Sequence, residues 1–276
     1  MRRGVSGGMV NGLRLLAAAA LMLALAGRAV GAPRGESTPV TNVVLVHGAW
    51  ADGSSWSGVI ERLLRAGYHV TAVQLGLQSL DQDVAKVRGV LAAQSGPTLL
   101  VAHSFGGAVV TQLGARAPNV VGIVYESAFA PDQGETMRTI VNQSPPAPGS
   151  VAIRPDRQGF LWLDPSGFLS YFAPDVAHMQ AQVMESVQKP IAASVLMGTE
   201  KFGPPAWRSF PTWYLVTDQD QMIPPEAQQK FAARMGARVA SIRGSHAAMV
   251  SHPDEVSGFI IAAAEGASAK PAHAAK

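Results

Sequence analysis

The sequence predicts an α/β fold, with a mostly parallel sheet, helices on both faces of that sheet and an inserted helical cap. Apolar segments of strand length alternate with helical segments from residue 41 onward, and this alternation is typical of parallel sheets covered by helices. One interval breaks the alternation, because about 85 residues separate Tyr125 from Pro211, far more than a crossover between parallel strands requires. A chain of 276 residues with 47% hydrophobic content is long enough for one well-buried domain with such an insertion.

The first 32 residues have the pattern of a secretory signal peptide rather than of a folded segment. Three arginines precede the apolar run LLAAAALMLALA at 15–26, and small residues follow up to Ala32. A basic start, a short apolar run and a small-residue cleavage region are typical of exported proteins, and the run is shorter than a membrane-spanning helix. We therefore expect cleavage within 26–32 and a periplasmic or secreted protein without stable membrane insertion. An uncleaved membrane anchor is the alternative.

The positive charge of the chain belongs to this first segment. The full sequence has a formal net charge of +3, and residues 1–32 contain four arginines and no acidic residue, so removing them would lower the net charge to −1. A nearly neutral chain without a basic patch does not favour nucleic-acid binding. The absence of cysteine excludes disulfides and cysteine-based metal sites.

Six strands and five helices are predicted in alternating order after the signal segment. The strand segments are short, apolar and rich in β-branched residues, as is typical of strands buried on both faces of a parallel sheet; they lie at 41–46, 69–73, 98–102, 120–125, 212–216 and 238–242. The helical segments have apolar residues at helical spacing or are bounded by glycine or proline; they lie at 57–66, 81–94, 105–117, 224–236 and 253–264.

The long interval is interpreted as a cap inserted at about 131–205. It is rich in aromatic residues and methionine and contains one helical segment at 175–188. We expect most of its aromatic side chains to form the cap's own core and a few to face a ligand. Outside the cap, we assign 33–40 to a linker, 41–265 to the domain and the small, polar residues 266–276 to a disordered tail.

A serine stands between a predicted strand and a predicted helix in the segment VAHSFGG, residues 101–107. A tight turn there would lift the Ser104 side chain above the carboxyl edge of the sheet, and such a turn requires small residues two positions before and after the serine. Ala102 and Gly106 fill these positions, although alanine departs from the usual first glycine. The structural alternative is that Ser104 only caps the following helix.

A serine hydroxyl is a weak nucleophile near neutral pH and needs a general base. His246 follows the last predicted strand in GSHAAM, and Asp218 and Asp220 follow the preceding strand in TDQDQMIPP. Each candidate comes after the carboxyl end of a different strand, where open parallel sheets form their ligand sites. The chain order of serine, aspartate and histidine is also that of one large class of hydrolases.

Two backbone amides are candidates for binding an oxyanion. The helix after Ser104 aims free N–H groups at anything bound to the serine, and the first of these is the N–H of Phe105. The segment VHGAW follows the first strand and contains Gly48, which allows the backbone to approach closely. The N–H of Ala49 is therefore expected to donate beside that of Phe105.

The segments VLVHGAW, VAHSFGG, TDQDQMIPP and GSHAAM together resemble the α/β-hydrolase superfamily. More narrowly, they resemble the branch of plant methyl-salicylate esterases, hydroxynitrile lyases and their bacterial esterase-like relatives. The resemblance implies the α/β-hydrolase fold, Ser104 as nucleophile, His246 as general base and an aspartate that orients the histidine. Matching TDQD to the family's segment places that aspartate at Asp220, with Asp218 as the alternative. Glu126 is a third candidate acid, because some hydrolases carry theirs after that strand; a hinge or surface carboxylate is the other interpretation.

The resemblance also separates two activities within this branch. In the lyases of this branch, a lysine follows the catalytic histidine and a threonine stands in the place of Gly48. In this sequence Ala247 follows His246, and Gly48 has no hydroxyl. Both differences favour ester hydrolysis over cyanohydrin cleavage. Two alternatives stay open. The first is another reaction on the same scaffold, such as that of a C–C lyase or a cofactor-free haloperoxidase. The second is a ligand-binding protein that keeps the three residues.

The remaining candidate residues are given structural roles. His103 and His47 are expected to pack or hydrogen-bond beside the serine turn and the oxyanion loop, and His252 to be solvated. Trp50 and Trp56 are candidates for the pocket lining, with packing in the core or on the surface as the alternative. The seven histidines show no metal-ligand spacing, so we predict no metal and no cofactor.

We therefore expect a serine-dependent hydrolase of small to medium, apolar carboxylic esters. Ser104, His246 and Asp220 would form the catalytic triad, and the amides of Ala49 and Phe105 would bind the oxyanion. The expected partner is a small-molecule ester, and the expected assembly is a monomer or a homodimer.

Overall fold

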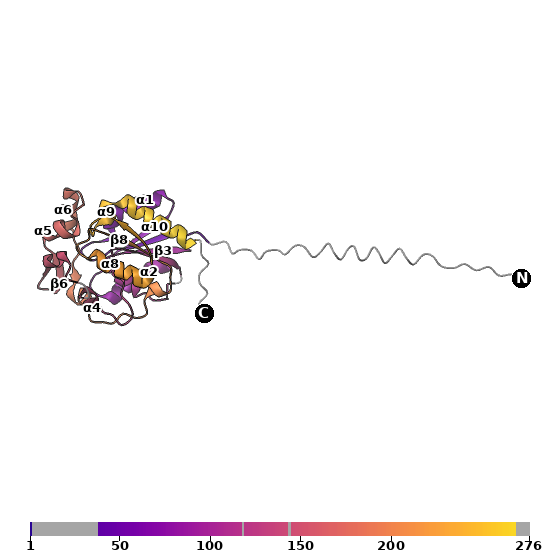
Figure 1. Ribbon diagram of the computed structural model, residues 1–276, viewed down its shortest axis with the longest axis horizontal. Coiled ribbons are helices and arrows are strands. Elements are labelled where there is room, and N and C mark those ends of the chain that lie inside the picture. Colours follow the sequence, from indigo (N-terminus) through magenta and orange to yellow (C-terminus); the bar gives the residue numbers. More distant parts are fainter. Residues whose placement is uncertain (2–37, 118, 143–144, 269–276) are drawn as a thin grey trace. The chain divides into compact units, whose positions relative to one another are not determined.

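The computed structural model describes Met1 and residues 38–117, 119–142 and 145–268 (Figure 1). Apart from Met1, the predicted signal peptide lies outside the described residues, as does most of the predicted linker. None of the helices in the described ranges combines the length and the apolar character of a segment that crosses a bilayer.

The six predicted strands form one parallel sheet. Its spatial order is β2 (His69–Val73), β1 (Asn42–Val46), β3 (Thr98–His103), β4 (Val120–Glu126), β8 (Thr212–Thr217) and β9 (Arg238–Ile242). The loops that follow the central strands β3 and β4 therefore lie next to each other at the carboxyl edge, where sites form in sheets of this kind.

Alternate residues of the central strands face two separate cores, which explains why these strands are apolar on both sides. In β3, Leu99 and Val101 face one core, while Leu100 and Ala102 face the other. The first core is covered by η1 (Gly53–Trp56), α1 (Ser57–Arg65), α9 (Ala248–Ser251) and α10 (Pro253–Ser268). The second core is covered by α2 (Leu80–Ala92), α3 (Phe105–Thr111) and α8 (Pro225–Met235).

Two predicted boundaries were wrong. The helix after Ser104 ends at Thr111 rather than at 117, because the chain turns at Gly114, whose φ of 60° is left-handed and suits glycine. The last helix continues to Ser268, so the tail predicted to begin at residue 266 begins too early, and Ala267 is buried. The Ser268 hydroxyl accepts a hydrogen bond from the N–H of buried Val40, which ties the end of the predicted linker to the domain.

The segment in which the cap was expected folds as a small mixed unit between β4 and β8. The predicted helix at 175–188 is present as α6 (His178–Ser186). The segment also contains an antiparallel sheet that the sequence analysis did not predict, with strand order β5 (Ile153–Pro155), β6 (Phe160–Leu163) and β7 (Ile191–Ala192). The other elements are α4 (Met137–Val141), η2 (Pro148–Ala152), α5 (Pro165–Gly167), η3 (Phe168–Phe172), α7 (Ala193–Leu196) and η4 (Ala206–Arg208). In Figure 1, α5, α6 and β6 lie together at one side of the domain.

Because the central strands are buried on both faces, a substitution that removes one of their core side chains should be among the most destabilising. Leu99→Ala in β3 removes a fully buried side chain and should lower the free energy of unfolding by about 3 kcal/mol, because a cavity remains. Leu64→Ala is the matched control: it makes the same change at a residue of α1 that is 55% exposed, and its effect should stay within about 0.5 kcal/mol. Urea unfolding curves measure both values, and equal losses would contradict the assignment of the core.

Candidate active site

Ser104 occupies the turn between β3 and α3 in a backbone conformation that L-residues rarely adopt. Its φ is 52° and its ψ is −124°, so the residue is strained. Three backbone hydrogen bonds hold it: its N–H donates to Glu126 O at 3.3 Å, and its carbonyl accepts from the N–H groups of Gly107 and Phe129 at 3.0 and 3.1 Å. The adjacent strand β4 and the loop after it thus fix the position of the serine.

Neighbouring backbone segments lie so close around Ser104 that two positions require glycine. A Cβ atom on Gly106 would lie 2.7 Å from the carbonyl oxygens of Val46 and His47, and one on Gly48 would lie 2.5 Å from Ser104 Cβ. These separations leave no room for a side chain, so the loop after β1 and the serine turn can meet only through glycine. Ala102, the departure from the usual pattern, is a fully buried residue of β3.

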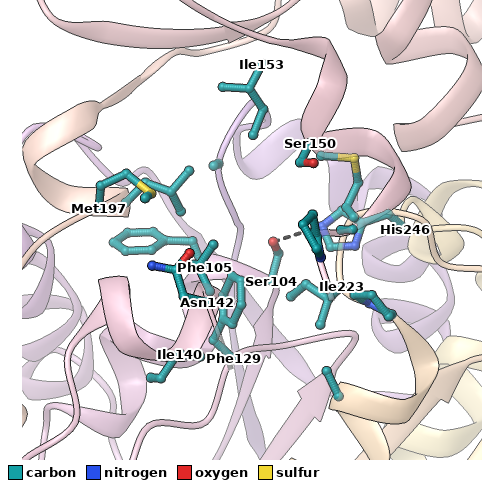
Figure 2. A pocket seen from close by; sticks show the side chains of 18 of the residues that line it. Ser104, Phe105, Phe129, Ile140, Asn142, Ser150, Ile153, Met197, Ile223 and His246 are labelled. Atoms are coloured by element: carbon teal, nitrogen blue, oxygen red, sulfur yellow. Dashed lines mark hydrogen bonds between the residues drawn. The ribbon is translucent and has the colours of Figure 1, made fainter. Parts of the chain in front are cut away.

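The structure brings Ser104, His246 and Asp220 together in one hydrogen-bonded chain. Ser104 Oγ lies 2.8 Å from His246 Nε2 (Figure 2), and His246 Nδ1 lies 2.7 Å from Asp220 Oδ2. All three side chains are buried. The other candidate acid of this loop, Asp218, is exposed and does not take part.

Asp220 accepts hydrogen bonds from five donors. Its Oδ1 accepts from the N–H groups of Met222 and Ile223, at 2.7 and 2.9 Å. Its Oδ2 accepts from Gln228 Nε2 at 2.9 Å and Thr217 Oγ1 at 3.3 Å, as well as from His246. Because the carboxylate only accepts, His246 Nδ1 carries the proton, and the lone pair of Nε2 faces the Ser104 hydroxyl.

Gln228 is a functional residue that the sequence analysis missed. It is fully buried on α8, where its amide oxygen accepts from the N–H of Thr217 at 3.1 Å while its amide nitrogen donates to Asp220. The only signal in the sequence is a polar residue on the apolar face of the helix, between Ala227 and Phe231.

Ala49 and Phe105, the predicted oxyanion donors, both line the pocket beside Ser104. Neither backbone N–H has a hydrogen-bond acceptor in the part of the chain that the structure describes. His47 fixes the peptide that carries the Ala49 N–H, since its Nδ1 donates to Gly48 O at 2.8 Å and its Nε2 accepts from the N–H of Leu75 at 2.9 Å. Burial lowers the pKa of His47 to about 4, so the ring is neutral and can make both bonds.

His103 packs against His246 and contacts its backbone. Its Nε2 lies 2.8 Å from the carbonyl oxygen of His246, and since a carbonyl only accepts, this nitrogen carries the proton. The two rings are 4.6 Å apart, and Phe172 packs edge-on against His246 at 5.1 Å. Burial lowers the pKa of His103 well below its ordinary value, which keeps the ring uncharged.

Glu126, the third candidate acid, has no side-chain hydrogen bond to His246, and the expectation of a surface carboxylate was wrong. The side chain is fully buried, and neither carboxyl oxygen has a hydrogen-bond partner among the described residues. Burial raises the pKa of Glu126 well above its ordinary value, and the nearby charge of Asp220 raises it further.

The serine opens into an apolar pocket of about 400 Å³. Figure 2 shows Phe129, Ile140, Met197 and Ile223 around Ser104. The aromatic residues that the sequence placed in the cap do not line this pocket: Phe168 and Phe172 stack 4.7 Å apart inside the cap, and Trp162 is partly exposed. The pocket lining contains no Asp, Glu, Lys or Arg among the described residues; it consists of Ala49, Trp50, Ser104, Phe105, Phe129, Ile140, Val141, Asn142, Pro145, Pro146, Ala147, Ser150, Ile153, Leu196, Met197, Met222, Ile223, Pro224, Ala227, Phe231 and His246.

Trp56 is part of the core, whereas His252 is less solvated than expected. The His252 ring is partly exposed and lies 2.8 Å from Ser251 Oγ, and the Trp56 ring is fully buried against His103. Within the described ranges, no group of three or more acidic or histidine side chains is arranged to hold a metal ion.

Comparison with known proteins gives a family and several relatives. Residues 43–259 match the model of the "Alpha/beta hydrolase family". The chain is 31% identical over 120 residues to a carbendazim hydrolyzing esterase of Nocardioides sp. (strain SG-4G), covering 39% of this chain and 50% of that protein. It is 29% identical over 123 residues to a pyrethroid hydrolase of Sphingobium wenxiniae, covering 40% of this chain and 44% of that protein. The chain thus matches about half the length of these two curated relatives.

The crystal structure of polyneuridine aldehyde esterase has the same fold. It superposes with a TM-score of 0.71 at 21% sequence identity, over 81% of this chain and 98% of that chain. The predicted α/β-hydrolase fold is therefore confirmed.

The buried carboxyl of Glu126, which has no hydrogen-bond partner in the described part of the chain, predicts a pH-dependent stability. Above its ordinary pKa the unfolded chain loses a proton that the folded protein retains, so the free energy of unfolding falls with rising pH, by up to about 1.4 kcal/mol per pH unit, until the folded-state pKa is passed. Glu126→Gln removes this dependence, so the variant should gain stability relative to the wild type as the pH rises from 5 to 8.

Urea unfolding at several pH values measures this difference. Glu255→Gln, at an exposed position of α10, is the control and should differ from the wild type by a constant amount. A difference for Glu126→Gln that does not change with pH would contradict the assignment of a neutral, buried acid.

Proposed function

Because the chain belongs to the alpha/beta hydrolase family, we propose that it hydrolyses carboxylic esters, with Ser104 as nucleophile, His246 as general base and Asp220 as the acid that orients the histidine. One observation carries the proposal: an unbroken hydrogen-bonded chain runs from Asp220 through His246 to a serine that faces an apolar pocket. The names of the relatives, a carbendazim hydrolyzing esterase, a pyrethroid hydrolase and polyneuridine aldehyde esterase, support it.

The first half of the reaction acylates the serine. His246 Nε2 takes the proton of Ser104 Oγ while Oγ attacks the carbonyl carbon of the ester. The carbonyl electrons move onto the oxygen, and the N–H groups of Ala49 and Phe105 donate to the resulting oxyanion. The bond to the alcohol oxygen then breaks, and His246 returns its proton to the leaving alkoxide.

The second half releases the acid. His246 removes a proton from a water molecule, which attacks the acyl carbon, and the bond to Ser104 Oγ breaks as the serine regains its proton. The net reaction converts an ester and water into an acid and an alcohol. Asp220 keeps the proton on His246 Nδ1 throughout and stabilises the imidazolium that forms in both halves.

The pocket favours uncharged substrates. Its volume of about 400 Å³ suits a small or medium ester, and no charged side chain of the described lining is available to pair with a charge on the substrate. A carboxylate or an ammonium group would therefore lose its hydration without compensation.

Removal of the nucleophile tests the mechanism. The wild-type protein should hydrolyse p-nitrophenyl esters from acetate to octanoate, and Ser104→Ala should lower kcat by about 10⁴-fold or more, because no other group supplies the nucleophile. Ser186→Ala changes an exposed serine of α6 and is the matched control. Equal activity of the wild type and Ser104→Ala would refute the role of the serine. A wild-type protein that hydrolyses none of these esters would refute the proposed function.

A pair of substrates of similar size tests the preference for uncharged esters. We expect kcat/KM for p-nitrophenyl hemisuccinate at pH 7 to be about 100-fold or more below that for p-nitrophenyl butyrate, since its carboxylate would enter the pocket unpaired. Each value is divided by the rate of the same ester with hydroxide, which removes differences in intrinsic reactivity. Comparable normalised values would show that charge is tolerated.

A further inference from the structure

Trp50 joins the oxyanion loop to the cap. It follows Ala49 and has a left-handed φ of 58°, which is unfavourable for a residue other than glycine. Two hydrogen bonds hold it there: its backbone N–H donates to Lys189 O at 3.0 Å, and its indole Nε1 donates to Leu161 O at 2.9 Å. Leu161 belongs to β6 and Lys189 lies just before β7, so both acceptors are backbone carbonyls of the cap.

These bonds complete the fixation of Ala49. The peptide group before this residue is held from the core, where His47 donates to Gly48 O. The peptide group after it is held from the cap, where Lys189 O accepts from the N–H of Trp50. Because peptide groups are planar, the bond to Gly48 O sets the direction of the Ala49 N–H. The bond of the Trp50 N–H then limits the rotation of Ala49 about φ and ψ, so that this direction is kept.

Asp175 joins the cap to the loop of the general base. It lies between η3 and α6, and its carboxylate accepts from both the N–H and the hydroxyl of Ser245, with 2.9 Å to the N–H. Ser245 precedes His246 directly, and its Oγ accepts from the N–H of Ala247 at 3.2 Å. Ser245 is therefore bound directly to a carboxylate of the cap, and Ala247 is linked to it through the Ser245 hydroxyl.

We propose that the cap positions both halves of the catalytic machinery: Trp50 sets the oxyanion amide of Ala49, and Asp175 sets His246 through Ser245. The two residues are positioning residues, and the inference rests on the proposed esterase function. The cap then does more than enclose the substrate, because it fixes the separation between the base and the oxyanion donor that a reacting ester must span. Displacements of about 1 Å in such geometry lower rates by about 100-fold.

Two substitutions with matched controls test the proposal. Trp50→Phe keeps an aromatic ring but removes the indole N–H donor. Its control Trp162→Phe makes the same change on the strand that contains Leu161, where the indole donates to Asp156 within the cap. Asp175→Asn weakens acceptance from Ser245, while its control Asp164→Asn alters a cap carboxylate that accepts from Ser166 and Gly167 instead.

We expect Trp50→Phe and Asp175→Asn each to lower kcat by about 10- to 100-fold, with melting temperatures close to those of their controls. The loss should be as large for p-nitrophenyl acetate as for the octanoate, because the acetate makes few contacts with the pocket. A role in substrate contact alone would instead raise KM for the octanoate and spare the acetate. Losses of kcat below twofold, or equal losses in Trp162→Phe and Asp164→Asn, would overturn the proposal.

Amide hydrogen exchange on the same proteins gives a result that does not depend on activity. Exchange should accelerate at 47–50 in Trp50→Phe and at 243–250 in Asp175→Asn, and in neither control. Unchanged exchange in both segments would overturn the positioning role even if the wild type is an active esterase. If the wild type hydrolyses no ester, the proposed function fails, and the exchange data still decide whether the cap holds these two loops.

Discussion

The left-handed backbone of Ser104 is the constraint on which the rest of the site depends. Such a conformation is unfavourable by about 1–3 kcal/mol and persists here because β4 and the loop after it supply hydrogen-bond partners to both the N–H and the carbonyl of the serine. The glycines follow from the same constraint. Gly106 allows α3 to start against β1, and Gly48 allows the oxyanion loop to touch the serine.

Two buried carboxyl groups near this turn have opposite environments, and the difference decides their roles. Asp220 lies among five donors, so it acts as an acceptor and fixes the tautomer of His246. Glu126 has no donor within the described residues, and burial favours its neutral form. A carboxyl group becomes useful for orienting a histidine only where backbone amides and a partner such as Gln228 surround it.

The strands, Ser104 and His246 could be predicted because they depend on local patterns: runs that are apolar on both faces, and polar residues directly after them. The same pattern offered both Asp218 and Asp220, and only the resemblance to the family favoured Asp220. The cap sheet could not be predicted, since its strands of three, four and two residues are too short for an alternation of apolar and polar residues to appear. Gln228 looks like a surface residue until the packing of α8 is known. The aromatic residues of the pocket come from outside the segment whose composition suggested a pocket; they are Trp50, Phe105, Phe129 and Phe231.

The acceptors that hold Trp50 are main-chain oxygens of Leu161 and Lys189. Every amino acid supplies such an oxygen, so mutation at these two positions leaves the attachment intact as long as the backbone follows the same path. Ile140, Leu196 and Met197 of the same inserted segment line the pocket with their side chains. The inserted segment can therefore diverge in substrate preference through the side chains that line the pocket while its backbone at Leu161 and Lys189 keeps the oxyanion loop in place. A graft of a foreign cap should succeed only if it restores that backbone path and a carboxylate at the position of Asp175.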